Sequence, residues 1–304
     1  MSRMAASVHP SPDLTVVIPT RDRPDKLGAA VESLLGQLGK GDALVVIDSA
    51  SRVPVAERVG EHERLRVLRL DVPGTSRARN AGLAAASTAI VAFVDDDVVA
   101  APSWSSEIRE AFEDPEVGFL TGRAIADRDV KLPVSAVVGE QRQRFDPAGD
   151  PSRLGGGVNM AFRRAALEQI GGFDGGMGPA TVLRAAEDHD VFWRLLRAGW
   201  SGFYEPSILV THRQWRTTGE AIRRQYAYGV GAGALAVKMI RCHDPRGWRM
   251  LRTRLWNDGV AMSGRNLLSG YQSGSAGAAL KSVGVIVGAA RASRKRLTND
   301  RFAG

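Results

Sequence analysis

Over its first hundred residues, the chain alternates between short apolar runs and longer segments whose apolar residues recur at helical spacing. The apolar runs predict strands, because a strand in a parallel sheet is buried on both faces and loses the alternation of polar and apolar residues. The segments between them predict helices. The predicted strands are 14–18, 43–47, 65–70 and 87–94, and the predicted helices are 24–38, 53–61 and 74–86. This order predicts an α/β fold, with a parallel sheet connected by right-handed crossovers.

The remaining pattern predicts a smaller set of strands and then only helices. Strands are expected at 117–123, 158–162, 203–204 and 208–211, helices at 102–112, 163–170 and 187–199, and long loops at 126–154 and 173–186. Three further helices are expected at 217–240, 246–268 and 276–290. We therefore expect a disordered N-terminus (1–12), an α/β domain (13–215) and a helical C-terminal region (216–304).

Three adjacent carboxylates, Asp95, Asp96 and Asp97, follow the fourth predicted strand directly. Burying unpaired charges is costly, so we expect them where the strand leaves the sheet, at the edge where open α/β sheets bind ligands. Such a cluster is typical of a site for Mg²⁺ or Mn²⁺ with substrate phosphates. The alternative is a solvated acidic turn.

Other predicted strands also end in polar residues. The first ends at Thr20, Arg21 and Asp22, the second at Asp48, and a late one at His212. Asp22 can cap the helix that follows. Asp48 is placed to accept a hydrogen bond from a base, or it is an ordinary turn aspartate. His212 is either structural or a neutral metal ligand.

Three other features are typical of residues that line a cleft, although each also has a purely structural interpretation. Arg77 lies near a helix start and can meet a phosphate or a base. Gly155–Gly157 lets the backbone pass close to a ligand, or forms a flexible turn. Glu187 and Asp188 open a helix after a glycine-rich loop; their carboxylates either suit the helix dipole or face the cleft.

Sequence motifs and composition exclude several classes. No G-x-G-x-x-G follows the first strand and no G-x-x-x-x-G-K-[ST] occurs, which argues against dinucleotide dehydrogenases and P-loop enzymes. The single cysteine, Cys242, excludes an internal disulfide and a cysteine-based metal site. We find no apolar signal segment and no window of 18 uncharged apolar residues, so we expect no transmembrane helix and a cytoplasmic location.

The basic charge is concentrated in the last third of the chain. Residues 216–304 contain 16 Lys and Arg but only 4 Asp and Glu, whereas residues 1–215 contain 25 Lys and Arg and 29 Asp and Glu. Basic helices with tryptophan, such as Arg246–Leu268, are typical of contact with the inner face of an anionic membrane. The alternative is a helical subdomain or a homodimer surface with a solvated basic face. No motif beyond charge indicates nucleic acid.

Taken together, the motifs resemble the family 2 glycosyltransferases, which have the GT-A fold. The matching pieces are Val17–Arg23, Val46–Ser51, Gly74–Gly82, Phe93–Asp97, Gly157–Arg163, Glu187-Asp188 and His212. The resemblance implies an inverting transferase that uses a divalent metal, Mn²⁺ or Mg²⁺, and a nucleotide-diphosphate sugar. UDP is the first candidate for the nucleotide and GDP or dTDP the alternatives; the acceptor is unknown. Residues 13–125 would bind the donor and residues 126–215 the acceptor.

The resemblance also implies roles for individual residues. Asp188 would be the general base. The implied donor-binding residues are Pro19, Thr20, Arg21, Asp48, Arg77, Asp95 and Asp96; the acceptor-binding residues are Gly156, Asn159 and Glu187; and the metal ligands are Asp97, Asp95 and His212. One departure from the family pattern, Ser49-Ala50-Ser51 after the second strand, leaves the nucleotide open.

Two alternatives share this fold. A sugar-1-phosphate nucleotidyltransferase would need a glycine-rich loop with arginine after the first strand, where this chain has Pro19–Pro24. A non-catalytic module would bind the nucleotide sugar without hydrolysis or transfer.

Overall fold

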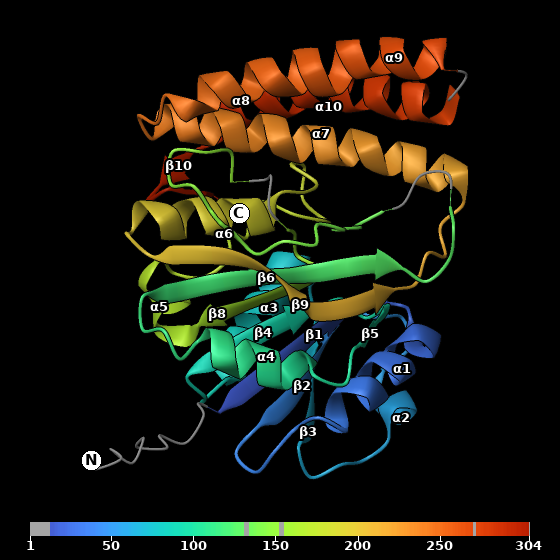
Figure 1. Cartoon of the computed structure of the whole chain (residues 1–304), viewed down its shortest axis with the longest axis vertical. Helices are drawn as coiled ribbons and strands as arrows, with labels where there is room; N and C mark the ends of the chain where they lie inside the picture. The colour runs from blue at the N-terminus through green and yellow to red at the C-terminus, as the bar shows by residue number, and fades with distance from the viewer. Residues whose placement is uncertain (1–12, 131–133, 152–154, 270–271, 304) are drawn as a thin grey trace, which may run out of the picture.

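The structure, a computed structural model, describes residues 13–130, 134–151, 155–269 and 272–303. The predicted disorder of residues 1–12 therefore lies outside the described residues. A mixed sheet forms the centre of the molecule, and a layer of long helices lies beyond helix α6 (Figure 1). The sheet strands are β1 (Leu14–Thr20), β2 (Ala43–Ser49), β3 (Leu65–Leu70), β4 (Ile90–Val94), β5 (Val98–Ala100), β6 (Val117–Ala126), β7 (Gln143–Arg144), β8 (Asn159–Arg163) and β9 (Ser201–His212).

The strand order is β3-β2-β1-β4-β8-β6-β9-β5, with β7 paired to β9. Strands β3, β2, β1 and β4 are parallel, as the sequence predicts. Strand β8 then runs antiparallel between β4 and β6, and β9 runs parallel to β6. The ends of β1, β2, β4, β6 and β9 therefore meet the start of β8 at one edge of the sheet.

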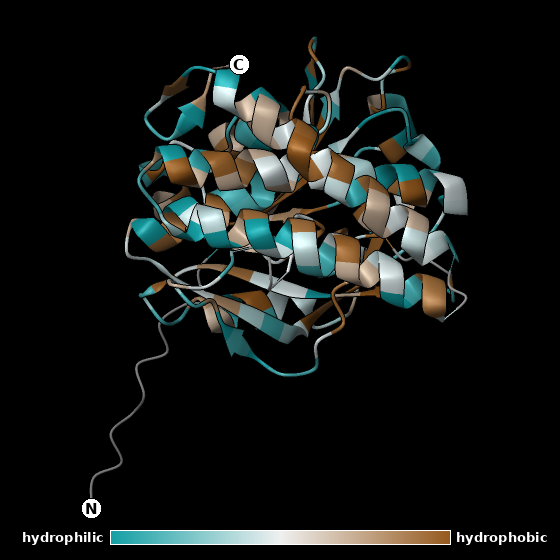
Figure 2. Cartoon of the chain, turned by 90° about the horizontal axis from the view of Figure 1, so that it is seen from above, coloured by the Kyte–Doolittle hydropathy of each residue, from teal (hydrophilic) through white to brown (hydrophobic). Residues whose placement is uncertain are grey.

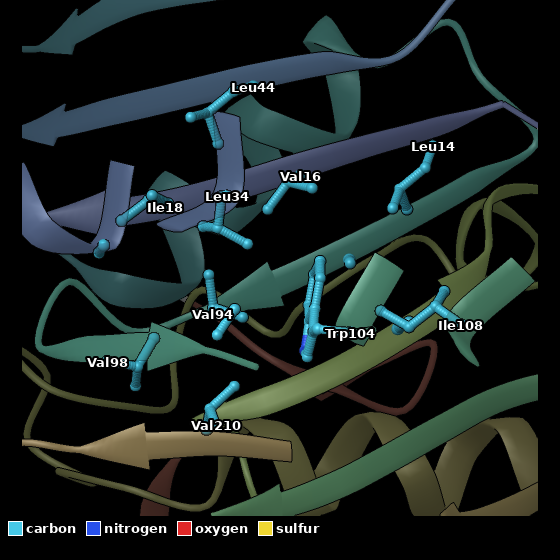
Figure 3. Close-up of a cluster of buried hydrophobic side chains, with 14 of the residues drawn as sticks. Leu14, Val16, Ile18, Leu34, Leu44, Val94, Val98, Trp104, Ile108 and Val210 are labelled. Carbon is cyan, nitrogen blue, oxygen red and sulfur yellow. The ribbon is translucent and has the colours of Figure 1, made fainter. Parts of the chain in front are cut away.

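Helices cover both faces of the sheet. They are α1 (Pro24–Leu35), α2 (Ala56–Val59), α3 (Thr75–Ala85), α4 (Trp104–Ala111), α5 (Arg164–Gln169) and α6 (Glu187–Arg197). Alternate residues of β1 point to opposite faces, because side chains alternate along a strand. Val16 joins a buried cluster with α1 and α4, shown around Trp104 in Figure 3, whereas Val17 joins a cluster with α3, α5 and α6.

The C-terminal third is helical. It consists of α7 (Thr218–Arg241), α8 (Arg246–Leu255), the π-helix η1 (Trp256–Ala261), α9 (Met262–Leu268) and α10 (Gln272–Arg294), followed by the hairpin β10 (Leu297–Thr298) and β11 (Arg301–Phe302). Trp193 of α6 joins Leu235 and Met239 of α7 in a third buried cluster. This cluster fixes the helical layer to α6.

Several local predictions are wrong. Asp22 does not cap α1, because Arg23 occupies the cap position; Asp22 has a positive φ and accepts a hydrogen bond from the Arg52 N–H instead. The two short strands near 203 and 208 are one strand, β9, with irregular pairing to β6. The sequence pattern also missed β5, a three-residue strand whose pairing with β9 depends on tertiary contact.

Helix α10 bears on the expectation that the chain has no membrane segment. Among the described helices, it alone has the length and apolar composition of a span; 33% of its apolar window is buried. The sequence criterion, a window of 18 uncharged apolar residues, did not select this helix, because α10 contains Lys281 and small polar residues within an otherwise apolar stretch. The helix packs along α7, so length and composition alone do not make it a span.

Candidate functional site

A cavity of about 590 Å³ opens at the sheet edge where the strand ends converge. Its walls come from the ends of β1 and β4, the loop before β8, the start of α6 and the helices α7, α8 and α10. Eight residues predicted from the sequence line it: Pro19, Thr20, Arg21, Asp95, Asp96, Gly156, Glu187 and Asp188. A second cavity of about 580 Å³ lies at the opposite strand ends, near Asp13 and Asp42, and contains none of the predicted residues.

The three adjacent aspartates have different surroundings. Asp96 is buried, and its oxygens accept hydrogen bonds from the Thr20 hydroxyl at 2.7 Å and from the Arg23 guanidinium at 2.9 Å. Burial raises the pKa of Asp96, and the positive charge of Arg23 partly offsets this rise. Asp96 therefore ties the end of β4 to the end of β1, so both strand ends keep a fixed position at the cavity.

Asp95, Asp97 and His212 place one ligand atom each within 4.8 Å of the others. The Trp215 indole N–H donates to Asp97 Oδ2 at 2.7 Å, and His212 Nε2 lies 3.1 Å from Asp97 Oδ1. Although burial disfavours its charge, the His212 ring and the Trp215 N–H hold the pKa of Asp97 far below its usual range. Burial and the neighbouring Asp97 raise the pKa of Asp95 to about 6.

This group fits a hard divalent cation. Asp97 Oδ1 is buried and accepts no hydrogen bond of good geometry from the described residues; its polar neighbour is His212 Nε2 at 3.1 Å. A buried carboxylate oxygen without a well-formed hydrogen bond is costly, and a cation is the natural partner for it. Two carboxylates and an imidazole are a donor set that Mn²⁺ binds, with water and phosphate oxygens completing its shell.

The acids at the start of α6 face the same cavity. Glu187 pairs with Arg79 at 2.9 Å, and Arg79 also donates to the Gly157 carbonyl at 3.1 Å and lies 3.7 Å from Asp95. Burial and the adjacent Asp188 raise the pKa of Glu187. Arg79 thus connects Glu187 at the start of α6 to Asp95 of the candidate metal-binding group through one buried cation.

Asp188 is oriented by backbone N–H groups. Its Oδ2 accepts from the Gly157 N–H at 2.6 Å, and its Oδ1 accepts from the His189 N–H at 2.8 Å. Burial opposes its charge, but His189, Arg79 and these hydrogen bonds give Asp188 a lowered pKa, so it is ionised at neutral pH. A Cβ at Gly157 would lie 2.6 Å from Arg79 Nη2 and 3.1 Å from Asp188 Oδ2, so a side chain here would displace Arg79 or Asp188 from this arrangement.

Five predicted residues do not line the cavity: Asp97 and His212, which are buried beside Asp95, and Arg77, Asp48 and Asn159. Arg77 is exposed on α3 and does not line it. Asp48 is buried, and its oxygens accept from Ser51, Val55 and Arg69. The Asn159 amide is buried and bonded to Arg123, Ile208 and Trp104, so it stabilises the sheet interior and is not available to an acceptor.

Sequence reasoning missed Arg23, Arg79 and Trp215. In α3 the buried positions are Ser76, Ala78, Arg79, Gly82 and Leu83, and this face follows from helical periodicity. Counting that register would have favoured Arg79 over Arg77, since Arg79 shares a face with the apolar Ala78 and Leu83. Nothing local in the sequence marks Trp215, which reaches Asp97 only through the turn after β9.

Comparison with known proteins identifies relatives of this chain. Residues 15–171 match the model of the family described as glycosyl transferase family 2. The pre-mycofactocin glycosyltransferase of Mycobacterium tuberculosis is 32% identical over 252 residues, which cover 77% of this chain and 51% of that protein. The chain thus spans about half the length of that relative. The O-antigen chain rhamnosyltransferase RfbN of Salmonella typhimurium is 23% identical, with 71% of each protein covered.

Solved structures share the fold. The mannosyltransferase PcManGT from Pyrobaculum calidifontis, in complex with GDP-Man and Mn²⁺, superposes with a TM-score of 0.64 at 16% identity, covering 96% of this chain and 91% of that one. TarS of S. aureus gives a TM-score of 0.55 at 18% identity over 75% of this chain and 40% of that one. These likenesses include the GT-A architecture of the sheet and its flanking helices.

Proposed function

The chain belongs to glycosyl transferase family 2, and we propose that it moves a sugar from a nucleotide-diphosphate sugar to an acceptor hydroxyl in one inverting displacement. The observation that carries the proposal is the meeting of two groups in one cavity. Asp95 lines the cavity and forms a candidate cation site with the buried Asp97 and His212, and Asp188 lines the same cavity across the Arg79 bridge. A cation site and a separate ionised carboxylate are what such a transfer needs.

Asp95, Asp97 and His212 would hold Mn²⁺ or Mg²⁺, which when bound offsets the negative charge that develops on the departing diphosphate. The protein prepares this site by burying Asp97 and His212 and by placing His212 Nε2 3.1 Å from Asp97 Oδ1. The Mn²⁺ and GDP-Man in the PcManGT structure support this choice of cation and donor class. UDP remains the first candidate for the nucleotide, and GDP or dTDP the alternatives.

Asp188 is the proposed general base. The acceptor oxygen forms a bond to the anomeric carbon while the bond from that carbon to the diphosphate oxygen breaks. The acceptor proton passes to Asp188, and the nucleoside diphosphate leaves. Attack from the face opposite the leaving group inverts the anomeric carbon. A positioned base of this kind contributes about 10²–10⁴-fold to the rate.

The surrounding residues keep Asp188 ready for this step. The Gly157 and His189 N–H groups fix both of its oxygens, and its lowered pKa keeps it ionised. Arg79 holds Glu187 beside it and also faces Asp95, which sets the distance between the proposed base and the cation site. Preorganisation of this kind lowers the cost of reaching the transition state.

The test compares Asp188→Asn with the wild type and with Asp71→Asn, a matched change at an exposed position. We measure binding of UDP-, GDP- and dTDP-sugars by calorimetry, and release of the nucleoside diphosphate to water or to sugar acceptors. Asp188→Asn should bind the donor as the wild type does and lose at least about a hundredfold in turnover. Turnover close to that of Asp71→Asn would remove Asp188 as the base. Donor binding without turnover in the wild type would favour the non-catalytic module.

A further inference from the structure

The exposed apolar side chains of this protein are concentrated on the helical layer. Of the thirteen large exposed apolar residues among the described ones, nine lie between positions 248 and 286. We call these nine the outer face: Trp248, Trp256, Val260, Met262, Leu267, Leu268, Leu280, Val283 and Ile286. Both tryptophans are 64% exposed and Leu268 is 91% exposed. Figure 2 looks onto this layer and shows hydrophobic residues interspersed with polar ones along its helices.

Helix α10 explains why part of this face stays uncovered. Its glycines pack on α7 so closely that a Cβ at Gly284 or Gly288 would overlap backbone atoms of Tyr226 or Val230. The small residues therefore serve the contact with α7, and Leu280, Val283 and Ile286 point away from it. A helix of a water-soluble domain normally exposes polar residues on such a side, and a clustered apolar surface indicates a binding partner.

Positive charge accompanies the apolar residues. Trp248, Arg252 and Trp256 follow each other at four-residue spacing and share one side of α8 and η1. Arg265 is exposed nearby, as is Arg249, whose guanidinium also donates to the Ala148 carbonyl; neither Arg252 nor Arg265 forms an ion pair with any residue that the structure describes. The one acid between positions 246 and 294, Asp258, is already paired with Arg254.

We propose that the outer face rests on an anionic lipid bilayer, with α8, η1, α9 and α10 lying along its surface. Leucine and valine side chains enter the acyl boundary, tryptophans occupy the headgroup region, and the arginines meet lipid phosphates. A second copy of the chain fits the face poorly, because the same unpaired arginines would meet each other across the interface.

The helices lie on the bilayer and do not cross it. Helix α10 is bound to α7 along its glycine side, and Lys281 within it lies 4.0 Å from Asp258. Arg254 and Lys281 line the cavity from the inner side of the same helices, whereas the outer face points away from it. Changes on the outer face therefore leave the proposed active site untouched, and the two proposals can fail separately.

The first test is co-sedimentation of the full chain with vesicles. Vesicles of phosphatidylcholine with phosphatidylglycerol should pellet the protein at about 0.1 M salt and much less at about 1 M, where the Debye length falls from about 10 to 3 Å. Vesicles of phosphatidylcholine alone should bind it weakly. No pelleting with the anionic vesicles would overturn the proposal.

Variants then locate the contact. Arg249→Gln/Arg252→Gln should weaken binding to anionic vesicles about thirtyfold, and Trp248→Ala/Trp256→Ala at least about tenfold. The matched control is Arg58→Gln/Arg66→Gln, which removes two exposed charges from the sheet domain and should bind as the wild type does. Equal binding by all variants would overturn the assignment of this face.

Two further measurements test whether the outer face affects the active site and whether it forms a contact between two copies of the chain. Nucleotide-sugar turnover in the absence of vesicles should be the same in the wild type and in Trp248→Ala/Trp256→Ala, because neither residue lines the cavity. Light scattering should give the same mass for both proteins. A dimer that dissociates in the tryptophan variant would identify the face as a contact between copies and would contradict the bilayer proposal.

Discussion

Replacing Lys238 by methionine should strongly destabilise the protein, because this lysine is the buried cation between the helical layer and α6. Its ammonium group lies 2.6 Å from Asp174 Oδ2 and 2.5 Å from Asp190 Oδ1, and all three side chains are fully buried. Methionine keeps most of the apolar volume and removes the charge. The experiment therefore isolates the electrostatic contribution from the packing contribution.

The two carboxylates are affected unequally. Asp190 keeps its ion pair with Arg194 at 2.7 Å. Asp174 keeps only hydrogen bonds from the Gly176 and Phe302 N–H groups, each at 2.8 Å, and loses its counter-charge. Leaving one buried charge without a partner costs about 3–5 kcal/mol. We expect Lys238→Met to lower the free energy of unfolding by that amount.

Urea denaturation followed by circular dichroism measures the effect. The double variant Lys238→Met/Asp174→Asn removes the unpaired charge and should recover about half of the loss or more. Lys40→Met, at an exposed position, is the control and should change the free energy of unfolding by less than about 0.5 kcal/mol. A loss below about 1 kcal/mol for Lys238→Met, or a double variant whose loss equals the sum of the two single losses, would show that an unpaired Asp174 charge does not cause the destabilisation.

Three further predictions follow from individual contacts. Gly288→Ala places a methyl group against a backbone carbonyl of α7 and should destabilise by about 1–3 kcal/mol, whereas Gly264→Ala meets nothing within 4 Å; equal melting temperatures would contradict this. Burial and the Asp300 carboxylate raise the pKa of Cys242 to about 11, so alkylation at pH 8 should be slow and Asp300→Asn should accelerate it; an unchanged rate would exclude the carboxylate as the cause. Burial opposes the charge of Asp244, but its hydrogen bonds with neighbouring side chains lower its pKa to about 2. The ionised carboxylate therefore contributes about 2 kcal/mol to the free energy of unfolding above pH 4, and this contribution is lost as the pH falls towards 2. Asp244→Asn should remove this part of the acid sensitivity in pH-dependent urea titrations.

The first half of the fold follows from the sequence, because its information is local. Continuous apolar runs and helical periodicity predict β1 to β4 and the helices between them, with β3 at the predicted bounds. Strand β5 has three residues and pairs with β9, more than 100 residues later, so no local pattern could reveal it. The antiparallel insertion of β8 between β4 and β6 likewise depends on long-range pairing.

Part of the candidate site was likewise predictable from local sequence, and part depended on long-range contacts. Polar residues at the ends of neighbouring parallel strands were expected to meet at one edge of the sheet, and Asp95, Asp97 and His212 do so. The sequence did not reveal that Asn159 serves the sheet interior, because its three partners come from distant segments. Arg79 was missed because motif matching favoured Arg77, although helical register places Arg79 on the buried face.

The most direct test of the central claim is calorimetric titration of a nucleotide-diphosphate sugar with Mn²⁺ and with EDTA, in the wild type and in Asp97→Asn. We expect Mn²⁺ to tighten donor binding at least about tenfold in the wild type and to have little effect in the variant. Equal donor affinity with Mn²⁺ and with EDTA in the wild type would contradict a cation held by Asp95, Asp97 and His212.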